Sequence, residues 1–351
     1  MEELRKYKVG EFWNKLLSAV AMAIVVGVTP GGILSPFIGG LAKNNAFWNS
    51  INMASTMCMY IVPVAAGVLA ANQFGFNMVE KASVAVASLI GSGAIVYKNN
   101  AFVLTGMGDL INTILIIALA IVVIFAVRKH VGSFSVLVEP ILCGSIVGAF
   151  GMWTYQYVHM ISVWVGNILN SFTTLQPVLM CTLLAMSFAV IIATPLSTVG
   201  LAYAIGISGI AGGASTVGVA SCFMIVAVAT FKMNGKGVSV AMFWGSVKMM
   251  LANFVRHPRM LIPIAIVGAI SGFVDSFIQV QNAPQFAGFG IPVGPIHAYS
   301  YMTQSPAIRI LILLAVYIVI PIIVSLVTVN LMRKVPKLYD DNDWKVDLDA
   351  K

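Results

Sequence analysis

The sequence predicts an all-α polytopic integral membrane protein with about eight to ten transmembrane helices. Hydrophobic residues make up 59% of the 351 residues and charged residues only 9%, against roughly a quarter charged in an average soluble domain. Most acidic residues lie at the two ends of the chain, and only Glu80, Asp109, Glu139 and Asp275 lie between Leu16 and Met332. This composition excludes an ordinary soluble enzyme, and it excludes a disordered chain, which requires low hydrophobicity.

Apolar segments follow one another along the chain with short interruptions. A polar segment, 1–15, precedes them, and no signal-peptide cleavage motif closes the first apolar run, so we expect that helix to be retained. The last run, from Ile310 to Met332, has no charged residue and a helical length of about 35 Å, which crosses a bilayer core of about 30 Å. The predicted apolar segments are 16–29, 51–71, 82–97, 104–127, 134–155, 177–194, 196–231, 260–280 and 307–332.

These segments divide the chain into a cytoplasmic N-terminal segment at 1–15, a first membrane half at 16–130, connecting helices at 131–176 and a second membrane half at 177–335. An acidic cytoplasmic tail follows at 336–351. The tail contains the sequence YDDNDWKVDLDAK, whose charge and polarity predict disorder.

Basic residues gather near the ends of the apolar segments. Under the positive-inside rule we place these clusters and both chain termini in the cytoplasm. Each half also contains a Thr-Pro dipeptide and ends with a basic pair, which predicts two degenerate structural repeats. The basic clusters lie at 5–8, 128–129, 232–236, 256–259 and 333–337, and the Thr-Pro dipeptides at 29–30 and 194–195.

Three segments at membrane depth are too rich in glycine and proline for uninterrupted helices: 29–41, 194–218 and 286–299. Exposed backbone polar groups cost several kcal/mol each in lipid, so such segments persist only where protein or a wet cavity surrounds them. We therefore predict re-entrant or broken helices that enclose a polar pocket. The predicted backbone and hinge residues are Pro30, Gly31, Pro195, Gly209, Gly212, Gly213, Gly288, Gly290 and Gly294.

Hydroxyl and amide side chains in these segments are candidates for contacting a solute. A half-helix N-terminus offers free N–H groups that suit an anionic or hydroxyl-rich solute, and neutral side chains add donors and acceptors. The alternative is that the hydroxyls bond to their own helices. The predicted substrate-binding residues are Thr194, Ser197, Ser215, Thr216, Asn282 and His297.

Two intramembrane acids, Asp275 and Glu139, are candidates for coupling transport to protons or ions, because a carboxylate in a bilayer requires a functional reason. His297 can both donate and accept a proton, although a lone histidine is also common as a structural residue. Glu80 and Asp109 flank apolar segments, and we expect both to be surface charges.

No known catalytic pattern occurs in the sequence. The cysteines at 58, 143, 181 and 222 stand singly in apolar segments, which is typical of buried hydrophobic residues and predicts neither disulfides nor a metal site. Nucleophile triads, zinc-protease motifs and phosphate-binding loops are absent from the sequence. We expect no cofactor, no catalysis within this chain and, without a basic stripe interleaved with aromatic residues, no nucleic-acid partner.

Five motifs resemble the second EIIC family of the bacterial phosphotransferase system, which includes perfringolysin O regulator-like proteins. They are TPLS at 194–197, GISGIAGGASTVG at 206–218, Pro258-Arg259, Asn282-Ala283-Pro284 and Gly288-Phe289-Gly290. The resemblance implies a homodimeric permease component of the bacterial plasma membrane that binds and translocates a sugar-like solute. Phosphotransferase IIA and IIB proteins would act in trans, since we expect no appended phosphotransfer domain.

The sequence departs from better-known EIIC families at two places. Val28-Thr29-Pro30 and Gly290-Ile291-Pro292 lack the glutamate of a GITEP-like motif, and His257 stands where asparagine is expected before Pro258-Arg259. Two alternative functions therefore stay open. One is a membrane-embedded ligand sensor or regulator, and the other is a proton- or ion-coupled carrier unrelated to phosphotransfer.

Overall fold

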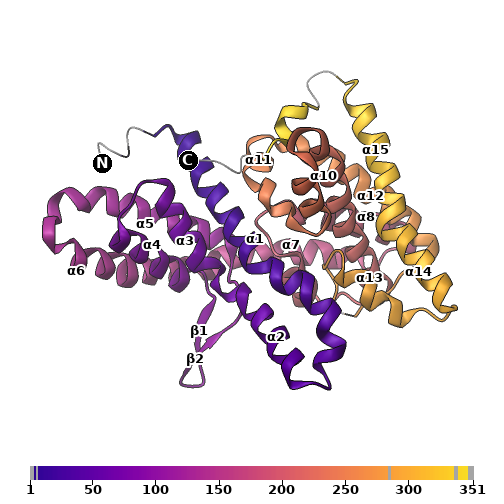
Figure 1. Cartoon of the computed structure of the whole chain (residues 1–351), viewed down its shortest axis with the longest axis horizontal. Helices are drawn as coiled ribbons and strands as arrows, with labels where there is room; N and C mark the ends of the chain where they lie inside the picture. The colour runs from indigo at the N-terminus through magenta and orange to yellow at the C-terminus, as the bar shows by residue number, and fades with distance from the viewer. Residues whose placement is uncertain (1–3, 5–6, 284–285, 336–338, 347–351) are drawn as a thin grey trace. The chain divides into compact units, whose positions relative to one another are not determined.

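A computed structural model describes residues 4, 7–283, 286–335 and 339–346. The described chain is mostly helical and divides into two compact units, Met1–Ile161 and Ser162–Asp347 (Figure 1). The division falls inside the predicted connecting segment, 131–176, and the two membrane halves stay a prediction. Parts of the predicted terminal segments and Pro284 of the Asn-Ala-Pro motif lie outside the described residues.

Six helical segments of the described chain are long and apolar enough to cross a membrane. One of them, Leu110–Phe172, contains two long helices, α5 (Leu110–Val131) and α7 (Gly148–Phe172), which are separated at Gly132 with φ 49°. The helix α8 (Pro177–Ile192) is apolar but shorter, at 16 residues. This pattern confirms the predicted polytopic helical membrane protein.

The first glycine-rich segment, 29–41, forms part of one continuous helix, α1 (Val9–Ala42), so the predicted interruption there is wrong. Pro30 and Gly31 lie inside this helix. Its glycines instead permit close packing: a Cβ on Gly27 would lie 2.3 Å from Val62 Cγ2, and one on Gly31 would lie 3.1 Å from the Ser55 carbonyl oxygen. Helix-breaking residues are tolerated in membrane helices when neighbouring helices satisfy the backbone.

The next helices of the N-terminal unit begin at asparagine caps. Asn45 accepts hydrogen bonds from the first turn of α2 (Ala46–Met57), and Asn77 forms a capping box with Glu80 at the start of α4 (Met78–Gly91). Between them, α3 (Val62–Gln73) packs against both α1 and α4. Glu80 is only 1% exposed and pairs with Arg128 at 3.2 Å, so the prediction that it is a surface charge is wrong.

A two-stranded antiparallel hairpin, β1 (Ile95–Lys98) and β2 (Ala101–Leu104), interrupts the helical pattern. The all-α prediction omitted it. Asn99 and Asn100 connect the strands with φ of 51° and 59°. A two-residue turn with positive φ at both positions matches the twist of a hairpin, and asparagine tolerates that conformation best after glycine.

Three helices of the N-terminal unit meet at a buried asparagine. Asn112 on α5 donates to the carbonyl oxygens of Gly91 (2.5 Å) and Gly151 (2.9 Å), and it accepts from Thr154 on α7. Nearby, α6 (Ser135–Pro140) leads through a π-helical stretch, Ile141–Val147, into α7. The buried amide therefore fixes α4, α5 and α7 against one another.

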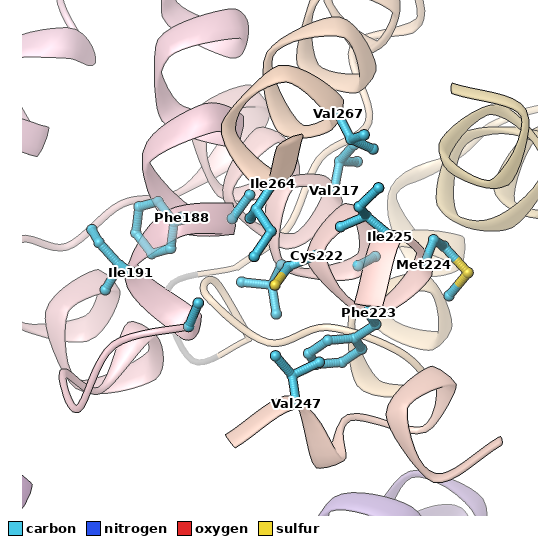
Figure 2. Close-up of a cluster of buried hydrophobic side chains, with 14 of the residues drawn as sticks. Phe188, Ile191, Val217, Cys222, Phe223, Met224, Ile225, Val247, Ile264 and Val267 are labelled. Atoms are coloured by element: carbon cyan, nitrogen blue, oxygen red, sulfur yellow. The ribbon is translucent and has the colours of Figure 1, made fainter. Parts of the chain in front are cut away.

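The C-terminal unit is built on α8, α10 (Gly209–Phe243) and α12 (Leu261–Ile278), which pack side by side (Figure 1). Small residues allow this closeness: a Cβ on Gly218 would lie 2.2 Å from the Ala185 carbonyl oxygen, and one on Gly272 would lie 2.4 Å from that of Cys181. Apolar side chains fill the space between the helices, including Phe188, Val217, Ile225, Ile264 and Val267 (Figure 2).

Shorter elements complete this unit. The helix α9 (Thr198–Ala204) lies between α8 and α10, and a 3₁₀ turn, Ser246–Met250, leads into α11 (Leu251–Arg256). After α12 come α13 (Val293–Ala298) and α14 (Pro306–Leu314), and α14 continues through a π-helical turn, Ala315–Val319, into α15 (Ile320–Met332).

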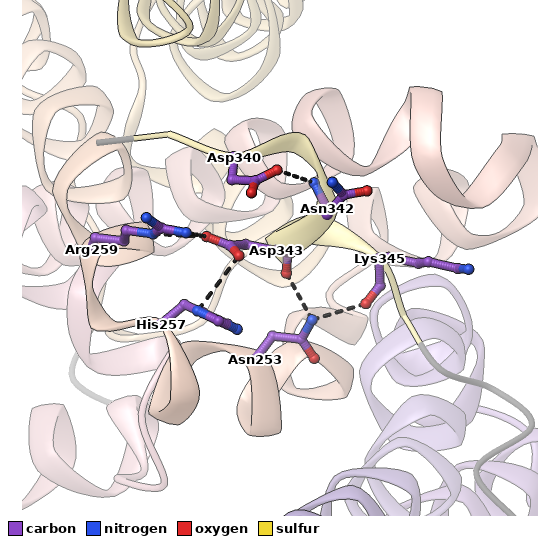
Figure 3. A network of polar contacts seen from close by, with 7 residues as sticks. All are labelled: Asn253, His257, Arg259, Asp340, Asn342, Asp343 and Lys345. Carbon is purple, nitrogen blue, oxygen red and sulfur yellow. Dashed lines mark hydrogen bonds and ion pairs between the residues drawn. The ribbon is translucent and has the colours of Figure 1, made fainter. Parts of the chain in front are cut away.

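The described part of the C-terminal tail, 339–346, is docked on this unit, so the predicted disorder is wrong there. Trp344 is 1% exposed and packs on Phe254. Asp343 pairs with Arg259 at 2.7 Å and with His257 at 3.5 Å (Figure 3). One buried aromatic residue, Trp344, and one carboxylate in contact with both Arg259 and His257 outweigh the tail's polar composition.

Candidate functional site

The second glycine-rich segment, 194–218, is interrupted twice, as predicted for its first part. The helix α8 ends at Ile192, α9 occupies Thr198–Ala204, and α10 begins only at Gly209. From Gly209 onward the chain is continuously helical, so the predicted break does not extend over 209–218. Gly206 and Gly209 have φ of 66° and 61°, a conformation that permits the turn between the two helices.

A buried lysine supports the first interruption. Lys248, on the 3₁₀ turn, donates from Nζ to the carbonyl oxygens of Thr194 (3.0 Å) and Leu196 (2.8 Å). Burial disfavours the ammonium and lowers the pKa of Lys248 to about 8. The lysine supplies donors to two carbonyl groups that lie outside any helix and would otherwise be unsatisfied.

The third glycine-rich segment folds back against α10. Residues 279–283 and 286–292 form no helix, and Asn282 donates its backbone N–H to the Gly209 carbonyl oxygen at 3.0 Å. This close contact is possible because Gly212 and Gly213 have no side chains. A Cβ on Gly213 would lie 1.8 Å from the Val280 carbonyl oxygen, and one on Gly212 would lie 2.6 Å from that of Asn282. The double glycine of α10 is therefore the surface on which this extended segment rests.

Polar side chains fasten the segment from several sides. Asn282 donates from Nδ2 to the Gly294 carbonyl oxygen (3.1 Å) and to Thr216 Oγ1 (3.3 Å), while Thr216 bonds to the hydroxyl of Tyr317 at 2.7 Å. Ser215 Oγ accepts the backbone N–H of Gly288 at 3.0 Å. All four of these side chains belong to fully buried residues. The network thus holds α10, the 279–292 segment, α13 and the last membrane helix together.

A cavity of about 320 Å³ opens at the start of α10. The helix begins with no side-chain cap hydrogen bond from Ser208, and the first N–H groups of a helix have no partner within it. Both polar and apolar side chains line the cavity. Its lining residues are Asn170, Thr173, Met180, Ile205, Gly206, Ile207, Ser208, Ile210 and Ala211.

The structure brings three of the predicted substrate-binding residues together, namely Ser215, Thr216 and Asn282, in the buried network. Thr194 lies at the end of α8, where its hydroxyl donates to the Ile191 carbonyl oxygen. The carbonyl of Ser197 accepts from Leu201 at the start of α9, and the ring of His297 stacks on Phe286. The cavity lining includes none of these six side chains. Their role in binding stays a prediction.

Sequence reasoning missed several polar residues of this region. Asn170 and Thr173 line the cavity, Tyr317 completes the network, and Lys248 supports the loop. Tyr317 and Lys248 carried a signal, because each is a lone polar group in an otherwise apolar stretch. Asn170 and Thr173 carried none, since they occur in a polar connection that resembles any loop.

The two predicted coupling acids are buried in different units. Asp275 is 0% exposed, and its Oδ1 accepts the Val280 N–H at 3.3 Å while Oδ2 has no hydrogen-bond partner among the described residues. Glu139 is 1% exposed, and within the described chain neither carboxylate oxygen has a hydrogen-bond partner. No group of three or more potential metal ligands occurs in the part of the chain that the structure describes.

Comparison with known proteins identifies the family. The family model described as "Phosphotransferase system, EIIC" matches residues 14–346, which is nearly the whole chain. The chain belongs to this EIIC family. No curated protein and no solved structure matches it. The resemblance read from the motifs at 194–290 is thereby confirmed, and the protein is a multi-pass membrane component of the phosphotransferase type.

Proposed function

We propose that this EIIC-family protein is a permease component that binds a small polar, sugar-like solute at the start of α10 and moves it across the membrane. One observation carries the proposal: a helix N-terminus without a side-chain cap opens into a cavity beside interrupted backbone in an otherwise apolar unit. In transporters, half-helix N-termini within broken segments are where polar substrates bind.

The chemistry of the cavity supports a neutral or anionic solute with several hydroxyl groups. The helix N-terminus offers N–H donors and a partial positive charge. Asn170, Thr173 and Ser208 add side chains that donate and accept, and the lining includes no charged side chain. Apolar lining residues such as Ile207 and Ile210 suit the carbon face of a sugar ring. A volume of about 320 Å³ lies at the small end of ligand pockets.

The buried network would then act as a support rather than as the contact surface. Ser215, Thr216 and Asn282 hold residues 280–282 and Gly288 on α10, so a shift of these residues would alter the cavity mouth through Gly209. Alternating access, in our proposal, moves one structural half against the other. We further propose a homodimer, both termini in the cytoplasm, and IIA and IIB partners acting in trans.

Solute binding by purified protein tests the proposal. We expect one member of a panel of radiolabelled sugars, polyols and sugar acids to bind and to enter proteoliposomes. Ser208→Trp should weaken binding about tenfold or more, because the exposed Ser208 side chain lines the cavity and an indole would fill it. Thr174→Trp is the matched control, since Thr174 is exposed near the cavity but does not line it. Failure of every solute to bind would refute the proposal.

A second candidate function, proton- or ion-coupled transport, is favoured by the unpartnered carboxylate oxygens of Asp275 and Glu139. A buried carboxylate without a donor is costly unless it carries a proton or binds a cation. Uptake would then depend on pH or on an ion gradient, and Asp275→Asn or Glu139→Gln would uncouple it. Uptake that is independent of both gradients in the wild-type protein would exclude this candidate.

A further inference from the structure

A second cavity of the C-terminal unit lies apart from the proposed solute site, along α10 and α15. It is a groove of about 550 Å³ with a mostly apolar lining and basic residues at one end. We call it the basic-rimmed groove. Its lining residues are Met224, Ala227, Val228, Phe231, Lys232, Ser239, Val240, Phe243, Ile322, Leu326, Val329, Asn330 and Arg333.

The two basic residues mark the same end of two membrane helices. Lys232 follows the apolar part of α10, before the non-helical Gly235 (φ 74°, ψ 178°), and Arg333 follows the candidate span Pro306–Met332 directly. Charged side chains at the ends of membrane helices lie at the interface between lipid and water. The rim of the groove is therefore at an interface, and the apolar lining that precedes Lys232 on α10 and Arg333 on the last membrane helix runs toward the bilayer centre.

The depth of the groove corresponds to one leaflet. At 1.5 Å per helical residue, Met224 lies about 12 Å below Lys232 along α10, and Ile322 lies about 16 Å below Arg333 along the last membrane helix. Half of a hydrocarbon core of about 30 Å is about 15 Å. An apolar chain that entered from the rim would thus be covered over the thickness of its own leaflet.

The charge at the rim is positive. Arg333 donates from Nε and Nη2 to Asp341 Oδ1, at 3.0 and 2.7 Å, so these two charges compensate each other. Lys232 is exposed and forms no ion pair with any residue that the structure describes. Asn330 adds an amide on the same lining. The rim therefore carries one uncompensated cation beside further hydrogen-bond donors.

We propose that the basic-rimmed groove binds an anionic phospholipid, with one acyl chain along α10 and α15 and the phosphate at Lys232 and Arg333. An apolar wall excludes a sugar, and an extended peptide would leave its backbone groups without partners there. A zwitterionic lipid would bring its own cation to the rim and lose the attraction of Lys232. Basic pockets at the ends of membrane helices recognise anionic headgroups by this attraction.

Lipid binding to the full-length protein, measured by native mass spectrometry, tests this proposal. We expect phosphatidylglycerol to bind about fivefold more tightly than phosphatidylcholine of the same chain length. Lys232→Gln should abolish that preference, while Lys236→Gln should retain it because Lys236 is equally exposed but does not line the groove. Val240→Trp should weaken both lipids, since Val240 is 55% exposed and an indole would fill the groove without disturbing the core.

Three results would overturn the proposal. Equal affinity for the two lipids in the wild-type protein would make the groove a general lipid-facing surface. Equal binding of glycerol phosphate, which has no acyl chain, would make it a phosphate site. A dimer that buries the groove and dissociates on Val240→Trp without any change in lipid binding would assign it to a second copy of the chain.

Discussion

At the scale of single residues, the candidate site depends both on glycines, which have no side chain, and on polar side chains that form hydrogen bonds. Gly212 and Gly213 let two carbonyl groups of the 280–282 segment approach α10 more closely than any side chain would permit. Asn282 and Thr216 then hold that segment in place by hydrogen bonds. Close approach and polar fastening are both needed because membrane helices have no hydrophobic force between them.

Gly213→Ala tests the close approach. Its Cβ would lie 1.8 Å from the Val280 carbonyl oxygen, so the segment must move, and overpacking of this kind costs about 1–3 kcal/mol. We expect a lower Tm in detergent and weaker solute binding. Gly237→Ala is the control, because a Cβ there meets nothing within 4 Å and alanine favours the helix. Equal Tm values for the two variants would contradict the packing described.

From the burial of Lys248 we predict that the free energy of unfolding depends on pH. Burial lowers its pKa to about 8 in the folded protein, against 10.5 for an ordinary lysine. Between these values the unfolded chain binds more protons, so the free energy of unfolding rises with pH, by at most about 1.4 kcal/mol per pH unit. Below pH 8 Lys248 is protonated in both the folded and the unfolded protein, so its contribution to the free energy of unfolding no longer changes with pH and is at its lowest. Thermal unfolding from pH 7 to 10 should show the rise in wild-type protein and lose it in Lys248→Met.

Three of the polar residues predicted to contact a solute are bonded to other parts of the protein in the structure. Ser215, Thr216 and Asn282 were predicted to line a pocket, and the structure instead shows them bonded to Gly288, Tyr317 and Gly294. A hydroxyl in an apolar helix has the same sequence signature whether it faces a solute or another helix. Only the position of the opposing element separates the two, and that element lies up to 101 residues away along the chain.

At the scale of elements, glycine and proline content alone did not separate a continuous helix from a broken one. The segments 29–41 and 194–218 are both predicted to be interrupted, and only the first part of the second one, 194–208, is. Gly206 and Gly209 have positive φ, whereas Gly27 and Gly31 have helical backbone and serve close packing on neighbouring helices. The two uses of glycine are identical in sequence, so the difference comes from tertiary packing.

Asn282→Ala tests the connection between the 279–292 segment and the rest of the unit. It removes the hydrogen bonds to Thr216 and Gly294, and the groups left unsatisfied in a buried place cost about 1–3 kcal/mol. We expect a lower Tm and reduced uptake. Gln281→Ala, at the exposed neighbouring residue, should change neither. A stable Asn282→Ala variant with normal uptake would show that the segment is held by packing alone.

At the scale of the whole molecule, composition predicted the membrane class and the motifs predicted the family, while the tail was predicted wrongly. Residues 340–343 read as a solvated acidic run, yet Asp343 meets Arg259 and Asp341 meets Arg333. The sequence of the tail does not show that these basic partners lie next to it in the folded protein. Acidic residues near the end of a chain indicate disorder only if the folded protein offers them no cationic side chains and no aromatic pocket to bind.

Trp344→Ala tests the docking of the tail. Trp344 is 1% exposed, and its backbone carbonyl accepts from Asn234 Nδ2 at 2.6 Å. Truncation of a buried aromatic residue costs about 3–5 kcal/mol in a core, so we expect the tail to detach and the amides of 339–346 to exchange hydrogen rapidly. Lys345→Ala should leave exchange unchanged, because Lys345 is exposed and contributes its carbonyl oxygen. Unchanged exchange in Trp344→Ala would mean that polar contacts alone hold the tail.

The predicted orientation can be tested on the last membrane helix with a pair of single cysteines. The span Pro306–Met332 is 27 residues, about 40 Å of helix, which exceeds a core of about 30 Å even with some tilt. Its two flanks are the exposed residues Gln304 and Lys334. Because basic residues favour the cytoplasm, an impermeant thiol reagent added to whole cells should label Gln304→Cys and not Lys334→Cys. Cys58 is only half-buried and should be replaced by serine in both variants, whereas the other three native cysteines are buried. Labelling of Lys334→Cys alone would contradict the predicted orientation, because it would place the basic end of this helix outside the cell.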